Sequence, residues 1–377
     1  MHDASLIVFT GIGALLLLLP LPLQWRARNS GTLLLIMWLF LGNLLVFVDC
    51  IVWWDSYSNP APIWCDIVTK FFVGLPVGIS ASSLCITRRL VMIASSSTVA
   101  ISQSKKRRAL FIDLLLGLIL PMIVMTLHYI VQPHRFDIWE GYGCQTSTRY
   151  SIVSVFTVTL WSPVITIIAA IYGIIAIRLF LSRRLQFQTI LKASRSGLDN
   201  RHYIRLLALA SVDIVLGLPF TLLALVKDIQ QRMTYPSWQW VHANWSRVDV
   251  YRADQYMSSG AFITNLTLPR WLPVLLAIVF FLFFGVSTDA IGEYGRWLRW
   301  LRQRCGFDFV SQKQELPKVI PKLGSTIVQP LGSDTKDENL GEEELLKDGG
   351  LFEPQSSMRP VVSKRVAVAV LVEREVA

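Results

Sequence analysis

The 377-residue sequence lacks the side-chain clusters on which catalysis within a membrane depends. Its five histidines form neither an HExxH motif nor a pair one helical turn apart, so a zinc hydrolase is not expected. It has no GxGD motif of an intramembrane aspartyl protease. Residues 268–287 contain no lysine that could form a Schiff base with retinal. We therefore expect no catalytic residues, no metal and no cofactor.

Acidic residues are also few, because 26 Asp and Glu stand against 36 Lys and Arg, which gives a net charge of +10. A basic chain can bind nucleic acid through phosphate contacts. Here, however, the positive charges gather in short loops between apolar segments. We interpret them as anchors at a membrane surface, and we expect contact with membrane lipids and no nucleic acid.

Long apolar runs are abundant. Seven of them cover approximately residues 6–23, 32–54, 63–87, 109–131, 152–177, 204–226 and 268–287. A helix of about 20 residues crosses the hydrocarbon core of a bilayer. The pattern predicts an all-α membrane protein, a seven-transmembrane helix bundle within residues 1–304 that ends in an amphipathic helix at about 289–304. Residues 305–377 are predicted to form a cytosolic, largely disordered tail.

Basic residues are concentrated in every second loop, namely those after the first, third and fifth apolar segments. The positive-inside bias places these loops and the C-terminus in the cytosol, and the N-terminus outside. The first segment has no Lys or Arg before it and no small-residue cleavage site. We interpret it as a retained helix rather than a signal peptide.

Two of the five cysteines, Cys65 and Cys144, fall on the side assigned to the outside, where disulfides persist. We expect a bond between them that holds the second outer loop over the bundle, with two unpaired thiols as the alternative. Asn244 begins a sequon in the third outer loop and is the expected glycosylation site. Cys305 follows the amphipathic helix and is a candidate for lipidation, with an unmodified thiol as the alternative.

Ionisable side chains within apolar segments are costly, and they are therefore candidates for function. Candidate ligand-binding residues are Asp49, Trp53, Trp54, Asp66, Lys70 and Asp213. Asp66 and Lys70 are one helical turn apart, so a mutual ion pair is the alternative to a functional role. Dense aromatic residues in the outer loops favour an apolar or amphipathic ligand. Pro219 interrupts the sixth segment and is a candidate helix hinge.

Arginines at the cytosolic ends of the segments are candidates for contact with a partner protein. They are Arg88, Arg89, Arg183, Arg184, Arg201 and Arg205. Apolar residues alternate with charge in residues 178–205, which is typical of a helical face that docks a partner helix or lies on anionic lipid. A collar that only anchors the bundle is the alternative. Asp113 lies near the basic cluster 105–108, and we expect a structural role for it.

Several short motifs, in their order along the seven segments, resemble those of fungal a-factor-type mating pheromone receptors, the class D G-protein-coupled receptors. They are Ile63-Trp64-Cys65-Asp66, Arg88-Arg89, Leu218-Pro219-Phe220, Phe283-Phe284-Gly285, Asp289-Ala290 and Tyr294. The similarity covers roughly the first three hundred residues. The third segment does not end in DRY and the seventh has no NPxxY, as expected for a chain outside the rhodopsin-like class.

The resemblance implies a multi-pass receptor of the plasma membrane. Its expected ligand is a secreted, farnesylated peptide pheromone, and its expected partner is the alpha subunit of a heterotrimeric G protein that feeds a MAP-kinase mating response. The residues themselves leave two alternatives open. One is a seven-helix scaffold with no ligand, and the other is a seven-helix small-solute transporter or channel. Such a protein would need a continuous polar path, and only Asp49, Asp66 and Asp213 could begin one.

Overall fold

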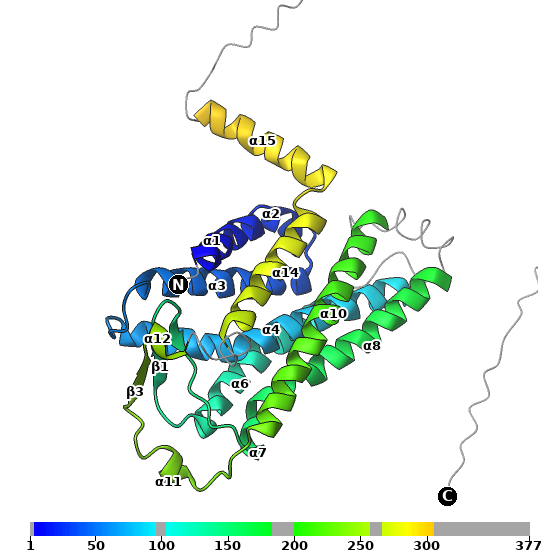
Figure 1. Ribbon diagram of the computed structural model, residues 1–377. Helices are drawn as coiled ribbons and strands as arrows, with labels where there is room; N and C mark the ends of the chain where they lie inside the picture. The colour runs from blue at the N-terminus through cyan, green and yellow to red at the C-terminus, as the bar shows by residue number, and fades with distance from the viewer. Residues whose placement is uncertain (1–3, 96–102, 183–199, 257–265, 305–377) are drawn as a thin grey trace, which may run out of the picture. The chain divides into compact units, whose positions relative to one another are not determined.

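The computed structural model describes residues 4–95, 103–182, 200–256 and 266–304, and most of these residues are helical (Figure 1). Among them, six helices are long and apolar enough to cross a membrane. The prediction of a helical, multi-pass membrane protein is therefore confirmed. The last apolar segment forms helix α14 (Leu268–Phe284), which is shorter, at 17 residues.

The first three spans follow the apolar segments closely. The first consists of α1 (Ala4–Leu18) and α2 (Leu21–Arg26), and the next two are α3 (Ser30–Val52) and α4 (Pro62–Ser95). Pro20 and Pro22 lack the backbone N–H that would continue α1, so a turn separates α1 from α2. Helix α4 continues eight residues beyond the predicted end at residue 87, and so Arg88 and Arg89 lie on the helix itself.

The fourth and fifth spans are interrupted near their prolines. The fourth consists of α5 (Gln103–Leu114), a π turn η1 (Leu115–Ile119), α6 (Leu120–Leu127) and a 3-10 turn η2 (His128–Val131). The fifth consists of α7 (Ile152–Ser154), a π turn η3 (Val155–Thr159) and α8 (Trp161–Ser182). Pro121 and Pro163 each follow a π turn within a few residues, as expected where a ring removes a helical hydrogen bond.

The sixth span is α10 (Asn200–Gln230), which contains Pro219. After α14 comes α15 (Thr288–Arg304), which matches the predicted amphipathic helix at 289–304. The side chain of Glu293 in α15 accepts a hydrogen bond from Arg26 in α2 and forms an ion pair of 2.5 Å with Arg296. The predicted tail, residues 305–377, lies outside the described residues.

A small sheet joins two connecting segments, a feature that the all-α prediction did not include. Its strands are β1 (Phe136–Trp139), β2 (Gly143–Gln145) and β3 (Val248–Tyr251), in the order β2–β1–β3. Strands β1 and β2 are antiparallel, with Ile138 opposite Cys144, whereas β1 and β3 are parallel. Two short helices flank β3, namely α11 (Trp238–Val241) and α12 (Ala253–Tyr256). Strands of three or four residues are too short for alternation to reveal them in the sequence.

Helix α4 forms the centre of the packing, because it contacts α3, α6, α8 and α10 (Figure 1). Its small residues Ala81, Ser82 and Ser83 are fully buried or nearly so, which allows neighbouring helix backbones to approach closely. Cys65 lies at one end of α4 and Arg88 near the other. Twenty-three residues of helix separate them by roughly 35 Å, a distance comparable to the thickness of the hydrocarbon core. We refer below to the disulfide end and the arginine end of the bundle.

Candidate functional site

A cavity of about 260 Å³ lies between α4, α8, α10 and α14, close to strand β2. A single water molecule needs a cavity of about 10–15 Å³, so this cavity is large enough for a ligand of many atoms. Its wall is mainly apolar, with Phe72, Leu75, Ile79, Phe220 and Leu276 among the lining residues. The arrangement favours an apolar ligand or an apolar part of one.

Polar side chains line the cavity at three places, namely between α4 and α8, at Thr221 on α10, and at the disulfide end. Between α4 and α8, the hydroxyl of Ser80 is 2.9 Å from that of Ser162 and accepts a hydrogen bond of 2.9 Å from Thr166. These hydroxyls satisfy one another, so they need no ligand. At the disulfide end, Gln145, Thr146 and Arg270 line the wall. Arg270, in the first turn of α14, is 5% exposed.

Arg270 was not a candidate in the sequence, where it counted as a charge of the third outer loop. The sequence does hold one signal: the arginine stands inside an apolar run, between Pro269 and Trp271. Helix α14 begins at Leu268, where the predicted seventh segment also begins, and it carries the arginine into the bundle. Its Nη2 donates long hydrogen bonds of 3.4 Å to the carbonyl of Cys144 and to Oε1 of Gln145.

A disulfide joins Cys65 of α4 to Cys144 of β2. The two Cα atoms are 5.3 Å apart, and both residues are fully buried in a cluster that also contains Trp53, Phe136 and Ile138. The bond attaches the sheet to the bundle beside Gln145, which lines the cavity. Gly143, just before the cysteine, has a φ of +75°, a conformation that glycine adopts without steric cost.

Asp49 and the two tryptophans after it lie beside this sheet. Asp49 is fully buried, and its Oδ1 accepts a 2.7 Å hydrogen bond from Nε1 of Trp64. Trp53 is also fully buried and donates to the carbonyl of Ser58 at 2.9 Å. Trp54 is partly buried. None of these three is among the described residues that line the cavity.

The mutual ion pair of Asp66 and Lys70, the alternative to a functional role for them, is not formed. Asp66 instead accepts from Nε and Nη2 of Arg135, at 2.8 and 2.5 Å. The hydrogen bonds to Asp66 raise the pKa of Arg135 above its usual value, so the guanidinium stays charged. The ammonium of Lys70 contacts the amide oxygen of Gln132, and is 3.1 Å from Nδ1 of His128. This alternative was wrong because the segment that follows α6 brings better-placed partners to each group.

Two further candidates lie on α10. Pro219 is inside the helix, and the next residue, Phe220, lines the cavity. Asp213 lies on the same helix, about two turns earlier, and its side chain is not described. A bend of α10 at Pro219 would therefore move part of the cavity wall.

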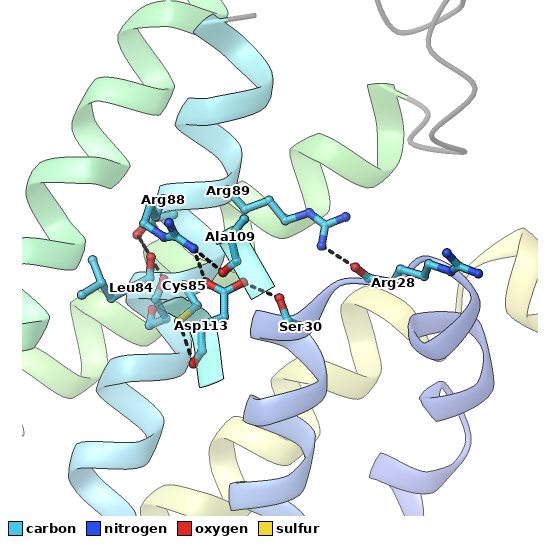
Figure 2. Close-up of polar contacts among 10 residues, drawn as sticks. Arg28, Ser30, Leu84, Cys85, Arg88, Arg89, Ala109 and Asp113 are labelled. Atoms are coloured by element: carbon cyan, nitrogen blue, oxygen red, sulfur yellow. Dashed lines mark hydrogen bonds and ion pairs between the residues drawn. The ribbon is translucent and has the colours of Figure 1, made fainter. Parts of the chain in front are cut away.

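The second polar centre lies at the arginine end, where α3, α4 and α5 meet (Figure 2). The carboxylate of Asp113 forms an ion pair with Arg88 and accepts a hydrogen bond from Ser30. Arg88 also donates to the carbonyl of Ala109 at 3.0 Å, and Arg89 donates to the carbonyl of Arg28 at 2.5 Å. Asp113 was expected to be structural and near the cluster 105–108. Its ionic partner in the structure is Arg88, from another helix.

The other candidates at this end are less fully described. Arg205 is partly buried on α10, and Arg201 is the second residue of the same helix, with a side chain that is not described. Arg183, Arg184 and Cys305 lie outside the described residues. At the disulfide end, Asn244 is exposed in a turn shortly before β3.

One group of side chains in the described region could hold a metal ion. His134, Asp137 and Asp249 place one ligand atom each within 4.8 Å of the others. Nε2 of His134 is 2.6 Å from Asp137 and 3.6 Å from Asp249, and Arg247 pairs with Asp249 at 2.9 Å. Burial raises the pKa of Asp137. Because Arg247 already supplies a cation, we interpret the group as a tie between β1 and β3.

Comparison with known proteins places the chain among fungal receptors. Residues 5–306 match the family described as pheromone A receptor. The chain is 33% identical over 344 residues to the pheromone B alpha 1 receptor of Schizophyllum commune, which covers 90% of this chain and 52% of that protein. It is 34% identical over 288 residues to pheromone receptor 1 of Mycosarcoma maydis, which covers 76% of this chain and 81% of that protein.

A more distant relative is the pheromone a factor receptor of Saccharomyces cerevisiae, 28% identical over 349 residues, or 90% of this chain and 71% of that protein. The chain spans about half the length of the Schizophyllum commune pheromone B alpha receptors that it matches. The family match includes all the described helices from α1 to α15, and thus both the cavity and the arginine end. The chain therefore belongs to the pheromone A receptor family of fungal membrane proteins.

Proposed function

We propose that this protein is a G-protein-coupled receptor of the plasma membrane that binds a secreted, prenylated peptide pheromone. The observation that carries the proposal is the apolar cavity beside the disulfide-linked sheet, in a chain of the pheromone A receptor family. Burying apolar surface contributes about 25 cal/mol per Å². A prenyl chain would therefore supply most of the binding energy in such a cavity, and the peptide would extend toward the disulfide end.

The proposed receptor crosses the membrane seven times. Helix α14 rises about 26 Å over its 17 residues, and the neighbouring residues 266–267 and 285–287 extend it toward the thickness of the hydrocarbon core. The N-terminus and the disulfide end face outward, and the C-terminus faces the cytosol. Three features support this orientation: basic residues at the arginine end, a disulfide at the other end, and Asn244 on the same side as the disulfide.

In this receptor the ligand shifts an existing equilibrium toward an active arrangement. The wall residue Phe220 follows Pro219, so a bound ligand would favour a different bend of α10. At the arginine end, Arg88 and Arg89 are bonded within the chain. Their release would open a basic surface for the alpha subunit of a heterotrimeric G protein, which would feed a MAP-kinase cascade. The other arginines of this surface are Arg183, Arg184, Arg201 and Arg205.

Asp49, Trp53, Trp54, Asp66 and Lys70 take an indirect part in this proposal. They lie at the disulfide end. Asp49 accepts a hydrogen bond from Trp64, and Trp53 donates one to the loop after α3. Asp66 accepts one from Arg135. We propose that they hold the sheet in position over the cavity, while the cavity wall contacts the prenyl chain. Asp213 would act from α10, the helix proposed to move.

The test is nucleotide exchange on the G protein, with the full chain expressed in a fungal cell that has no other pheromone receptor. Pools of farnesylated peptides are compared with the same pools without the prenyl group. The expected result is exchange that requires both the prenyl group and the receptor. Solute flux through the protein, without exchange, would contradict the proposal and favour a transporter or channel.

A pair of variants ties the response to the cavity. Thr221→Phe would fill part of the cavity, because Thr221 is buried in its wall. Val226→Phe introduces the same ring on the same helix at an exposed position. With equal amounts of protein at the cell surface, we expect the response to fall at least tenfold in the first variant and to stay unchanged in the second.

A further inference from the structure

Arg270 is a charged residue in a place where charge is costly. It is 5% exposed and lines the cavity. A guanidinium has five N–H donors, and each donor that is buried without a partner costs free energy. Such a group persists in a protein only where something compensates it.

Within the described part of the chain, Arg270 has few partners, and its hydrogen bonds are all made by one nitrogen, Nη2. Nη2 makes the two 3.4 Å contacts with Cys144 and Gln145. The rings of Tyr142 and Phe72 lie 5.2 and 6.0 Å from the guanidinium carbon, which favours the cation but accepts no ordinary hydrogen bond. Asp49 is close enough for an electrostatic interaction, without forming an ion pair. Nη1 has no hydrogen-bond partner among the described residues.

We propose that Nη1 of Arg270 donates a hydrogen bond to a carbonyl oxygen at the polar end of an apolar ligand in the cavity. This inference rests on the proposed function and adds to it the group that selects the ligand. The apolar wall would take the prenyl chain. In a prenylated peptide, the carbonyl nearest to that chain belongs to the terminal cysteine. With the prenyl chain in the apolar part of the cavity, this carbonyl would lie at the disulfide end, near Arg270. The ligand would satisfy the donor that the chain leaves unpaired.

Two small probes that differ in the ester group containing this carbonyl test the proposal. N-acetyl-S-farnesylcysteine methyl ester carries it, and N-acetyl-S-farnesylcysteamine lacks the whole ester group. Binding of each is measured on the full chain in lipid nanodiscs, above the binding to empty nanodiscs. For the unchanged protein we expect the ester to bind about ten- to a hundredfold more tightly, as a hydrogen bond from a charged donor predicts.

The informative variants are Arg270→Met and Arg270→Lys, with Arg252→Met as the matched control, because the Arg252 side chain is 57% exposed in the third outer loop. In Arg270→Met the preference for the ester should fall to less than threefold, while the ester-free probe keeps its affinity. In Arg270→Lys the preference for the ester should fall at least threefold, because one ammonium group cannot replace both Nη1 and Nη2 of the guanidinium. Arg252→Met should behave like the unchanged protein.

Any of four outcomes would overturn the inference. Equal weakening of both probes in Arg270→Met would assign the arginine to packing. Unchanged affinity of both probes in Arg270→Met would exclude the hydrogen bond. If Arg270→Met does not fold, judged by its thermal unfolding, an unchanged preference in Arg270→Lys excludes it instead. Failure of both probes to bind the unchanged protein saturably would contradict the proposed function itself, and the inference with it.

Discussion

The carboxylate of Asp113 joins three helices at the arginine end. It accepts from Ser30 of α3 and pairs with Arg88 of α4, while its own backbone belongs to α5 (Figure 2). The Asp113 side chain is 4% exposed and that of Arg88 is 20% exposed. Removing one partner of a buried ion pair costs about 3–5 kcal/mol. In the proposed receptor this contact therefore stabilises the arrangement in which Arg88 cannot reach a G protein.

We predict that Asp113→Asn raises G-protein nucleotide exchange in the absence of pheromone severalfold. The amide keeps the shape of the side chain but removes the negative charge, so the arrangement with Arg88 released becomes more populated. Basal exchange per receptor at the cell surface is the measurement.

The matched control for this prediction is Asp66→Asn. It also removes an arginine–aspartate pair involving α4, but at the disulfide end, where Asp66 contacts Arg135. We expect it to leave basal exchange unchanged. Equal basal exchange in Asp113→Asn and in the unchanged protein would show that the contact between Arg88 and Asp113 does not restrain the receptor.

Among the elements, the span from α5 to η2 shows how a proline is accommodated. Pro121 has no N–H to donate to the carbonyl of Gly117, four residues earlier. That carbonyl instead accepts a 2.9 Å hydrogen bond from Nε1 of Trp38, on α3. The hydrogen bond missing within one helix thus becomes a hydrogen bond between two helices. The same proline both interrupts this span and attaches it to its neighbour.

The disulfide between α4 and β2 is a covalent link between elements at the disulfide end of the bundle. It closes a loop of 79 residues, for which chain entropy in the unfolded state predicts a stabilisation of about 4 kcal/mol. We predict that Cys65→Ser, Cys144→Ser and the double variant lose surface expression and pheromone response to the same extent, because each removes the same bond. Surface labelling and dose–response curves measure both effects.

Cys50→Ala supplies the control, because Cys50 is buried and is not part of the disulfide. It should lower stability only slightly and leave the response intact. A double variant that is clearly worse than either single variant would mean that the two cysteines act separately.

The helices were predictable and the site was only partly so. The apolar runs predicted the long helices, since hydrophobic length alone identifies such segments, and the amphipathic pattern predicted α15. The sheet was missed, because β1, β2 and β3 depend on pairing between distant segments and not on local pattern. The ionic partner of Asp66 was missed for the same reason. Lys70 was the partner considered, whereas the structure places Arg135 there, 69 residues away along the chain. Arg270 was not a candidate, although the predicted segment 268–287 contains it, because its burial depends on how α14 packs in the bundle.

At the scale of the whole molecule, the orientation remains a prediction with a direct test. Asn244 is exposed near β3, on the same side as the disulfide. If this side faces outward, the expressed protein should carry an N-linked glycan, and Asn244→Gln should remove the corresponding shift on a gel after expression in a fungal cell. A glycan that instead depends on a sequon introduced into residues 183–199 would reverse the assigned orientation.

The order of helix contacts has a consequence for how the chain can be divided. Helix α14 packs on α1 and α3, and α10 packs on α4 and α8. If the chain were divided between α8 and α10, the two fragments would share two helix interfaces. One is formed by α14 with α1 and α3, and the other by α10 with α4 and α8. Within a membrane, helices associate through close packing, and formation of one interface would align the helices of the other. The two halves of this polypeptide, synthesised separately, should find each other and rebuild the same cavity.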